Sequence, residues 1–322
     1  MIVVAGEALI DLLVTADGSV TASPGGGPFN TARAIARLGV PVTFLGRLSG
    51  DRFGRSMAAL LAADAVRIVP PEPAAEPTTL AVAEIVGGQA RYRFYMDGTA
   101  APSLLPNHLV ALADEPPAAV HVGTLGLLVE PMASTLEGYV LGLAAEVLVV
   151  VDPNPRPETV RDLAAYRRRL DRVLGRADVV KVSREDMAVV RPGLPAEAAA
   201  RSLLADRGPD GAAGPAAVLL TDGADPVLVV TAAGERRVAV PSVDVVDTVG
   251  AGDAFGGAFL AWWVAAGHDR HGLADPDLVA AGVRVAVEVA SATSTRAGAD
   301  PPRRSELPAL AALWPEAERD PA

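Results

Sequence analysis

Short apolar runs that alternate with helical segments are the feature that most constrains how this chain can fold. Residues 120–123 and 147–151 are valine-rich runs, and the segment near 132–145 between them is long enough for a helix. A strand-helix-strand unit of this kind lays its two strands parallel in one sheet. Further apolar runs begin at residues 2–5 and 178–181. The sequence therefore predicts an α/β protein built on a mostly parallel sheet.

Two predicted hairpins stand apart from this alternation. They cover residues near 12–21 and 78–95, and each is split by a turn that contains glycine. A sheet of so few strands needs one face covered. We therefore expect a small sheet appended to the main domain, where it covers a substrate cleft, a partner subunit or both.

Composition narrows the class of protein. The chain has 322 residues, 50% of them hydrophobic, which suits one large α/β domain or one domain with a small appendage. The formal net charge is -11 and no basic stripe is present, so we expect no nucleic-acid partner. The absence of cysteine excludes disulfides and thiolate catalysis.

The apolar segments carry no targeting or membrane signal. Residues 1–13 lack a basic start and contain Glu7 and Asp11, so we interpret them as the first core strand rather than a signal peptide. The longest uncharged apolar stretch, residues 254–267, is too short and too rich in glycine for a membrane span. We therefore expect a cytoplasmic protein without a membrane partner.

Residues 247–255, Asp-Thr-Val-Gly-Ala-Gly-Asp-Ala-Phe, carry the strongest chemical signal. Their glycines allow a tight turn, and the free N–H groups of a helix that begins there favour an anion such as a phosphate. An acid at the edge of that site would repel a phosphate, but it suits a base that takes the proton of an attacking hydroxyl. Asp253 is therefore a candidate base. The alternative is a turn whose Asp caps a buried helix.

A second glycine-rich stretch, residues 24–30, precedes a helix predicted over residues 31–38. It lacks the Gly-x-Gly-x-x-Gly spacing of dinucleotide sites, which disfavours a nicotinamide-dependent oxidoreductase. Asn30 offers both a donor and an acceptor, which suits a sugar hydroxyl, although a plain glycine-rich turn is the alternative. Asp11 follows the first strand, where doubly wound folds bind ligands, or it is a solvated loop acid.

Polar residues also follow the later strands. A loop stiffened by three prolines carries Asn154 and Arg156 at a strand tip. Ser183 is predicted to cap a helix whose acidic first turn includes Asp186. Arg156 could meet a substrate carboxylate, a phosphate or only solvent, and the same alternatives stay open for Arg93 in the second hairpin.

Together the two glycine-rich stretches resemble those of the ribokinase-like sugar kinases, and the resemblance extends over nearly the whole chain. It rests on residues 24–30, on residues 46–54 that follow the next strand, and on residues 247–255. The resemblance implies transfer of the γ-phosphoryl group of ATP to a hydroxymethyl group of a sugar. It also implies Mg²⁺ and, in most members, K⁺ as cofactors.

The resemblance also implies an architecture. We expect a doubly wound α/β fold in a single kinase domain, residues 1–322. The lid is expected to be a small β-sheet formed by about 11–22 and 77–98. A lid with an apolar face further suggests a homodimer that forms through the lid sheet.

Roles for individual residues follow from the same resemblance. Asp253 is implied to be the catalytic base, and Gly250, Ala251 and Gly252 the anion hole. The candidate sugar contacts, which include the glycines of the lid hinge, are Asp11, Gly25, Gly26, Asn30, Arg93, Asn154 and Arg156. The candidate ATP contacts are Lys181, Ser183, Thr221, Gly223 and Gly252.

Two cation sites are implied as well. An acid and backbone carbonyls would hold the monovalent cation, and the matching positions are Asp247, Val249, Thr293, Arg296 and Gly298. Pro302 falls where some members supply a side-chain oxygen. The Asn-x-x-Glu motif that helps to place Mg²⁺ appears here as Ser183-x-x-Asp186, so Asp186 is an indirect magnesium candidate.

Three shorter stretches resemble the bacterial fructokinases most, namely residues 152–157, 180–186 and 295–302. We therefore expect the conversion of D-fructose to fructose 6-phosphate. A 2-keto-3-deoxygluconate kinase, a ribokinase and a nucleoside kinase are the alternatives within the family. A sugar- or nucleotide-binding regulator without catalytic activity is the alternative of a different class, because a fold does not guarantee a function.

Overall fold

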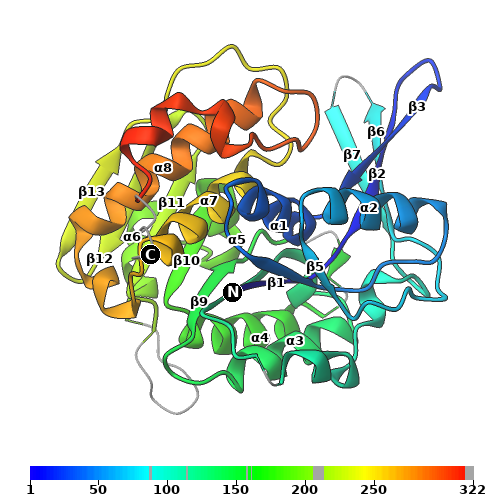
Figure 1. Ribbon diagram of the computed structural model, residues 1–322, viewed down its shortest axis with the longest axis horizontal. Coiled ribbons are helices and arrows are strands. Elements are labelled where there is room, and N and C mark those ends of the chain that lie inside the picture. Colours follow the sequence, from blue (N-terminus) through cyan, green and yellow to red (C-terminus); the bar gives the residue numbers. More distant parts are fainter. Residues whose placement is uncertain (87–88, 114, 157–158, 161, 206–213, 316–322) are drawn as a thin grey trace, which may run out of the picture.

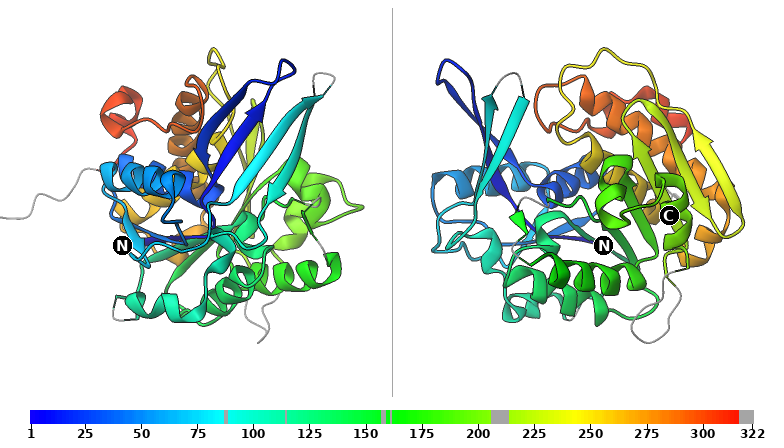
Figure 2. Two further views of the ribbon diagram at one scale, coloured as in Figure 1. Left: turned by 90° about the vertical axis from the view of Figure 1, so that its right-hand side faces the viewer. Right: turned by 180° about the vertical axis from the view of Figure 1, so that it is seen from behind.

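The computed structural model contains two β-sheets flanked by helices (Figure 1). The larger sheet has nine strands in the order β13-β12-β11-β10-β9-β8-β1-β4-β5, and the smaller has four in the order β3-β2-β6-β7. The small sheet rises from one end of the large one (Figure 2). The residues that the structure describes are 1–86, 89–113, 115–156, 159–160, 162–205 and 214–315. Within these ranges no helix is both long and apolar enough to cross a membrane.

The large sheet is parallel from β5 through β11, and β12 and β13 extend it antiparallel at one edge. Its strands are β1 (Ile2–Ala5), β4 (Val42–Leu45), β5 (Arg67–Val69), β8 (Ala119–Gly123), β9 (Leu148–Asp152), β10 (Val179–Ser183), β11 (Ala217–Asp222), β12 (Asp225–Thr231) and β13 (Gly234–Val238). This arrangement confirms the predicted doubly wound, mostly parallel α/β fold.

The central position of β1 in the sheet explains why its sequence is continuously apolar. Ile2 and Val4 enter one hydrophobic core, and Val3 and Ala5 enter the other, so both faces of the strand are buried. Strands of parallel sheets covered by helices on both faces read as unbroken apolar runs for this reason. The carboxyl end of β1, where the chain reaches Gly6, therefore opens between the two helical layers.

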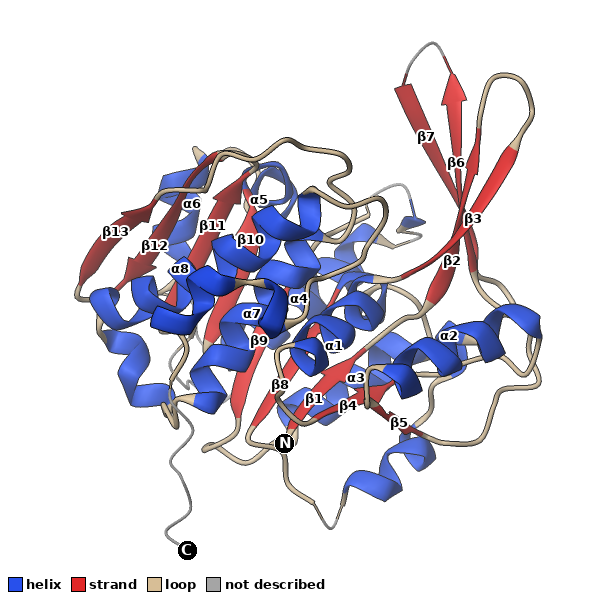
Figure 3. Cartoon of the chain, turned by 45° about the horizontal axis from the view of Figure 1, so that its top comes forward, coloured by secondary structure: helices blue, strands red, loops and turns tan. Residues whose placement is uncertain are grey.

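Helices cover both faces of the large sheet (Figure 3). Residues of α1, α2, α7 and α8 share the core on one face, and those of α3, α4, α5 and α6 share the core on the other. The α-helices are α1 (Gly27–Arg37), α2 (Arg52–Ala63), α3 (Met132–Leu141), α4 (Leu163–Arg176), α5 (Arg184–Val190), α6 (Ala196–Leu203), α7 (Ala251–Ala265) and α8 (Pro276–Ser294). The 3₁₀ helices are η1 (Ala101–Ser103), η2 (Pro106–Leu112), η3 (Thr124–Leu127), η5 (Arg270–Ala274), η6 (Arg304–Glu306) and η7 (Pro308–Ala312).

The start of α1 differs from the prediction. This helix begins at Gly27, directly after the hinge glycines, rather than at residue 31. Pro28 is tolerated there because the first turn of a helix leaves its N–H groups without intrahelical partners. As a result Asn30 lies inside the first turn of α1.

The small sheet is built from the two predicted hairpins. Its strands are β2 (Leu9–Val14), β3 (Val20–Gly25), β6 (Leu80–Val86) and β7 (Gln89–Tyr95). Strands β2 and β6 pair in parallel, so the two hairpins join into one sheet. Leu9 and Ala81 pack with Leu125 of the main domain, which anchors the base of the small sheet to the body.

A buried carboxylate fixes α1 against the segment that follows α8. Asp64, at the end of α2, accepts hydrogen bonds from Arg33 and Arg37 of α1, each at 2.9 Å. Arg303 donates to the same carboxylate at 3.0 Å. Removing one partner from a buried ion network is costly, because it leaves an uncompensated charge. This network therefore holds the predicted sugar-binding helix and the C-terminal segment in one position.

Candidate active site

The two glycine-rich motifs meet at one hydrogen bond, although their residues are 223 positions apart. Asn30 Nδ2 in the first turn of α1 donates to Asp253 Oδ2 in the first turn of α7, at 2.9 Å. Thr31 Oγ1 also donates to the main-chain oxygen of Asp253, at 3.3 Å. The structure thus brings the predicted base, Asp253, beside Asn30, a residue predicted to bind the sugar.

The predicted anion hole, Gly250, Ala251 and Gly252, forms the start of α7. Gly250 is the N-cap residue with a φ of 78°, in the left-handed region that favours glycine, and no side chain caps the helix. A Cβ atom added to Gly252 would lie 3.0 Å from Lys181 Nζ, so the ammonium group approaches this turn closely. A helix N-terminus together with an ammonium group favours a bound phosphate.

Lys181 of β10 and Asp152 of β9 form a buried ion pair beneath this turn. Nζ donates to Oδ2 at 2.7 Å, and the side chains are only 7% and 2% exposed. Burial alone would lower the pKa of Lys181, but the carboxylates of Asp152 and Asp253 outweigh it and raise that pKa. Lys181 therefore remains charged at neutral pH.

The environment of Asp253 suits a base. Burial raises the pKa of its carboxyl group to about 6, against the hydrogen bond from Asn30 and the charge of Lys181, which lower it. Burial, followed by the nearby charge of Asp253, also raises the pKa of Asp11 to about 6. Both carboxyl groups are therefore deprotonated at neutral pH but have more affinity for a proton than free aspartate has.

The small sheet contributes Asp11 from β2, beside Gly25 at the end of β3 and Gly26 before α1. A Cβ atom added to Gly25 would lie 1.9 Å from Asp11 Oδ2, so any side chain at Gly25 would displace this carboxylate. Gly26 has a φ of 104°, which disfavours other residues. A close approach thus requires glycine at position 25, and a left-handed backbone favours it at position 26.

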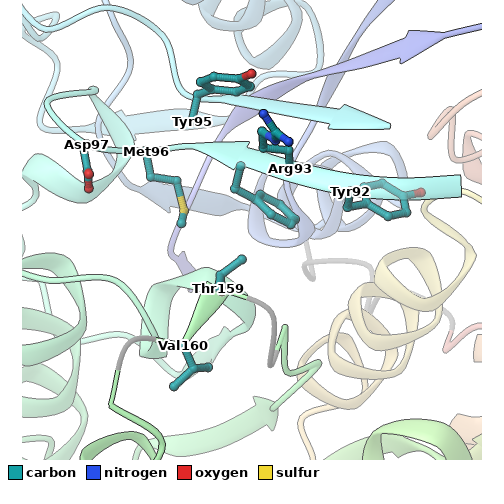
Figure 4. Close-up of a pocket in the computed structure, with 8 residues that line it drawn as sticks. Tyr92, Arg93, Tyr95, Met96, Asp97, Thr159 and Val160 are labelled. Atoms are coloured by element: carbon teal, nitrogen blue, oxygen red, sulfur yellow. The ribbon is translucent and has the colours of Figure 1, made fainter. Parts of the chain in front are cut away.

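Arg93 lies on the opposite face of the lid from Asp11. In the register of the sheet, Arg93 of β7 is paired with Val82, whereas Asp11 is paired with Ala81, and adjacent residues of a strand point to opposite faces. Figure 4 shows the side chain of Arg93 directed away from Thr159. Arg93 also contributes to the lining of the cavity described next, and its contact with a sugar stays a prediction.

A cavity of about 470 Å³ opens between β7 and the loop after β9 (Figure 4). Its lining includes Tyr92, Phe94 and Met96 of the lid side and Thr159 and Val160 of the loop. Met96 points toward Thr159 in Figure 4. The cavity thus lies between the small sheet and the loop that follows β9.

Arg156 faces the site, and Asn154 holds it there. Arg156 Nη1 donates to Asn154 Oδ1 at 2.6 Å, and Asn154 itself has a left-handed backbone with a φ of 30°. The charge of Arg156 lowers the pKa of both Asp11 and Asp253, which places the guanidinium near these carboxylates. Asn154 thus orients the guanidinium group of Arg156, and a role of either residue in binding a sugar stays a prediction.

The predicted nucleotide contacts gather at the carboxyl ends of β10 and β11. Ser183 and Thr221 are opposite each other in the register of these strands, and Gly223 follows in the turn to β12 with a φ of 54°. Ser183 Oγ accepts from the N–H of Asp186 at 3.0 Å and donates to its Oδ2 at 2.6 Å. The predicted helix cap is thus present, and the carboxylate of Asp186 lies beside it.

Asp247 joins the segment before α7 to the loop after α8. Its Oδ1 accepts from the N–H of Val249 at 3.0 Å, and its Oδ2 accepts from the N–H of Gly298 at 2.8 Å. The Thr293 hydroxyl donates to the main-chain oxygen of Val289 within α8, and the main-chain oxygen of Thr293 accepts from the N–H of Arg296 at 3.1 Å. The structure brings the segments that carry Asp247, Val249, Thr293, Arg296 and Gly298 together next to the start of α7.

Two buried polar residues near the site received no role from the sequence. Glu7, just after β1, accepts from the hydroxyl of Thr124 and lies within the electrostatic reach of Asp253. His121 of β8 is 2% exposed, and burial, followed by the charge of Lys181, lowers its pKa to about 3. The hydrogen-bond partner of Glu7 could not be predicted from the sequence, because Thr124 lies 117 residues further along the chain.

Comparison with known proteins decides the family. The model of the pfkB family of carbohydrate kinases matches residues 1–303 of the chain. The chain belongs to this family. It is an ATP-dependent sugar kinase, and the resemblance found in its sequence is confirmed.

Relatives of this kinase include several fructokinases. It is 36% identical to the fructokinase of Rhizobium leguminosarum bv. trifolii over 81% of this chain and 79% of that protein. It is 30% identical to fructokinase-1 of Oryza sativa subsp. japonica over 96% of both chains. Among solved structures, the fructokinase of Xylella fastidiosa with bound ATP superimposes with a TM-score of 0.83 and 28% identity, covering 96% of this chain and 97% of that one. The Vibrio cholerae O395 fructokinase with fructose, ADP and a calcium ion gives a TM-score of 0.79 at 25% identity, covering 96% and 97%.

Proposed function

We propose that this sugar kinase is a fructokinase that converts D-fructose and ATP to fructose 6-phosphate and ADP. The hydrogen bond between Asn30 and Asp253 carries the proposal, because it joins a sugar-binding group to the group that would activate the sugar hydroxyl. The relatives named fructokinase support fructose as the substrate. Asp253, Gly250–Gly252 and the residues around Asp11 are proposed as the site.

The reaction follows from this geometry. Fructose binds between Asp11 and Asn30, and Asp253 takes the proton of the hydroxyl group that attacks the γ-phosphorus of ATP. The new oxygen–phosphorus bond forms as the bond to the ADP oxygen breaks, and ADP leaves with the electron pair. The amides at the start of α7 and the ammonium of Lys181 stabilise the charge on the transferred phosphoryl group. Closure of the lid excludes water, which would otherwise hydrolyse ATP.

Mg²⁺ is proposed to enter with ATP. Asp152 Oδ1 is buried and has no hydrogen-bond partner among the described residues, so it fits an interaction with the cation or its water. Asp186 adds a second carboxylate nearby. Within the described ranges no group of three or more acidic or metal-ligating side chains could hold a metal, so the phosphates would supply most ligands.

K⁺ is proposed to bind beside the start of α7. Asp247 supplies the carboxylate, and the carbonyl groups of Val249, Thr293, Arg296 and Gly298 supply the remaining oxygens. Pro302 offers no side-chain oxygen. A cation there would neutralise Asp247 next to a turn that must bind phosphate.

The substrate is tested by initial rates of ADP formation with fructose, ribose, 2-keto-3-deoxygluconate and adenosine, each with and without K⁺. We expect the highest kcat/KM with fructose and a higher rate with K⁺. A preference for 2-keto-3-deoxygluconate would instead assign Arg156 to a substrate carboxylate. Saturable binding of fructose without ADP formation would favour the regulator.

A loss of activity at acidic pH is expected from the raised pKa of the base. Asp253 acts only when deprotonated, so kcat/KM for fructose should fall as the pH drops through about 6. Asp11 titrates in the same range and interacts with Asp253, so the apparent pKa belongs to the pair. A rate profile that stays flat well below this pKa would contradict a base in this environment.

Gly25→Ala is expected to raise KM for fructose with little effect on KM for ATP. The added methyl group would overlap Asp11 Oδ2, since the Cβ position lies 1.9 Å from it, and would push the carboxylate from the sugar site. Gly138→Ala in α3 is the control for an added methyl group, because this residue is exposed, its backbone is helical and nothing lies within 4 Å of its Cβ position. Equal effects of both substitutions on KM for fructose would show that the contact with Asp11 is not the cause.

A homodimer through the lid sheet is also proposed. The face of the lid that carries Arg93 includes Val20, which is 58% exposed, and Tyr95, which is 49% exposed. Sedimentation of the wild type and of Val20→Asp tests the dimer, since a charge at this position should produce monomers.

We further propose that residues 1–322 form one kinase domain with its lid at about 11–22 and 77–98, and that the enzyme works in the cytoplasm.

A further inference from the structure

Glu7 is a buried carboxylate whose two oxygens are both engaged. It lies two residues beyond β1 and is 2% exposed. Its Oε1 accepts from the Thr124 hydroxyl and from the N–H of Gly27, the latter at 3.3 Å, and its Oε2 accepts from the N–H of Gly126 at 3.2 Å. Burying a carboxylate costs free energy unless hydrogen-bond donors compensate it. The three donors around Glu7 supply this compensation.

The donors belong to the two segments that border the catalytic base. Gly27 is the first residue of α1, and α1 has no side-chain cap of its own because Gly26 precedes it. Glu7 therefore supplies from β1 the negative group that the start of α1 lacks. Thr124 and Gly126 lie in η3, where Thr124 holds a left-handed backbone with a φ of 52°. This conformation is costly for a β-branched residue and needs support from its surroundings.

Glu7 reaches Asp253 through one intervening residue. A Cβ atom added to Gly27 would lie 3.2 Å from Asp253 Oδ1 and 2.8 Å from Thr124 Cγ2, so Gly27 lies close to both the base and η3. Asn30 in the same helical turn donates to Asp253 Oδ2. The hinge is close as well, because a Cβ atom added to Gly26 would lie 2.6 Å from the main-chain oxygen of Glu7.

We infer that Glu7 is a positioning residue for phosphoryl transfer: it fixes the first turn of α1, and with it the lid hinge and Asn30, against the carboxylate of Asp253. The inference rests on the proposed function and deepens it. Glu7 does not touch the substrate. Its effect passes through Gly27 to the alignment of the sugar with the base, and it does not extend to the nucleotide side at Thr221.

Glu7→Gln tests this role with little change of shape. The amide group that replaces one oxygen is a donor, so it faces an existing donor and breaks at least one of the three hydrogen bonds. We expect kcat/KM for fructose to fall by about tenfold to a hundredfold, because a buried donor is left without its acceptor. KM for ATP should stay within about twofold of the wild type. Hydrogen exchange of residues 25–31 should become faster.

Asp178→Asn is the matched control. Asp178 is also 2% exposed and also accepts from a backbone N–H, that of Val149 at 2.8 Å, but it lies at the amino end of β10, away from α7. This variant should lose stability without a change in KM for fructose or in exchange at residues 25–31. Thr124→Val, which removes one donor and keeps the carboxylate, should change the fructose kinetics in the direction of Glu7→Gln.

Kinetics and hydrogen exchange together distinguish a failure of the role of Glu7 from a failure of the proposed function. If the wild type phosphorylates fructose while Glu7→Gln and Thr124→Val keep its kinetics and exchange rates, the role of Glu7 is overturned and the proposed function stands. If the wild type phosphorylates no sugar, the proposed function is overturned, and exchange at residues 25–31 still decides whether Glu7 holds this turn. Equal losses for fructose and ATP would make Glu7 a general structural residue and also overturn the inference.

Discussion

Replacing Asp253 with asparagine is expected to lower kcat for fructose phosphorylation by about 10²–10⁴-fold, the usual range for loss of a general base. Asparagine keeps the volume of the side chain and can still bond to Asn30, so the fold should be preserved. Binding of ATP should also persist, because the amides at the start of α7 and the ion pair of Lys181 remain. Steady-state kinetics and equilibrium ATP binding of the purified variant measure both effects.

The control for this variant is Asp269→Asn. Asp269 is an exposed carboxylate that caps η5, so its replacement removes the same charge far from the site. Its kcat should equal that of the wild type. If Asp253→Asn instead turned over at a near-normal rate, Asp253 would not be the base, and the hydrogen bond to Asn30 would have only a structural role.

Replacing Lys181 with methionine is expected to reduce both stability and turnover. The substitution leaves Asp152 as a buried charge without its partner, which typically costs about 3–5 kcal/mol of unfolding free energy. It also removes the ammonium group next to Gly252, and loss of one such charge-stabilising group typically lowers kcat by about 10²–10³-fold. Because Lys181 lowers the pKa of Asp253, the acidic limb of the pH profile should move to higher pH.

The double variant Lys181→Met with Asp152→Asn separates these two effects. Neutralising Asp152 removes the unpaired charge, so unfolding in urea should return toward the wild-type midpoint. Turnover should stay low, since the ammonium group is still absent and Asp152, which is proposed to face Mg²⁺, has lost its charge. Recovery of turnover together with stability would mean that Lys181 serves only to neutralise Asp152.

Much of this architecture was predictable because its causes are local. The strand Ile2–Ala5 is buried on both faces, so its sequence is apolar throughout and indicates a central parallel strand. Gly250 and Gly26 mark left-handed turns that few other residues adopt. Such requirements involve only residues that are close in the sequence, so they can be predicted from it.

The remaining features depend on contacts between distant segments. Arg93 and Asp11 lie on opposite faces of the small sheet because of the way β2, β6 and β7 pair. The hydrogen bond from Asn30 to Asp253 and the bond from Thr124 to Glu7 span 223 and 117 residues. None of these follows from periodicity or from the spacing of a motif.

The most direct test of the central claim is ³¹P NMR of the wild-type protein incubated with D-fructose, ATP and Mg²⁺. The site joins a base, a sugar ligand and a phosphate-binding turn, so it should form fructose 6-phosphate and ADP in equal amounts. Asp253→Asn should form almost none under the same conditions. A wild-type protein that binds fructose and ATP but yields no phosphate ester would contradict the account.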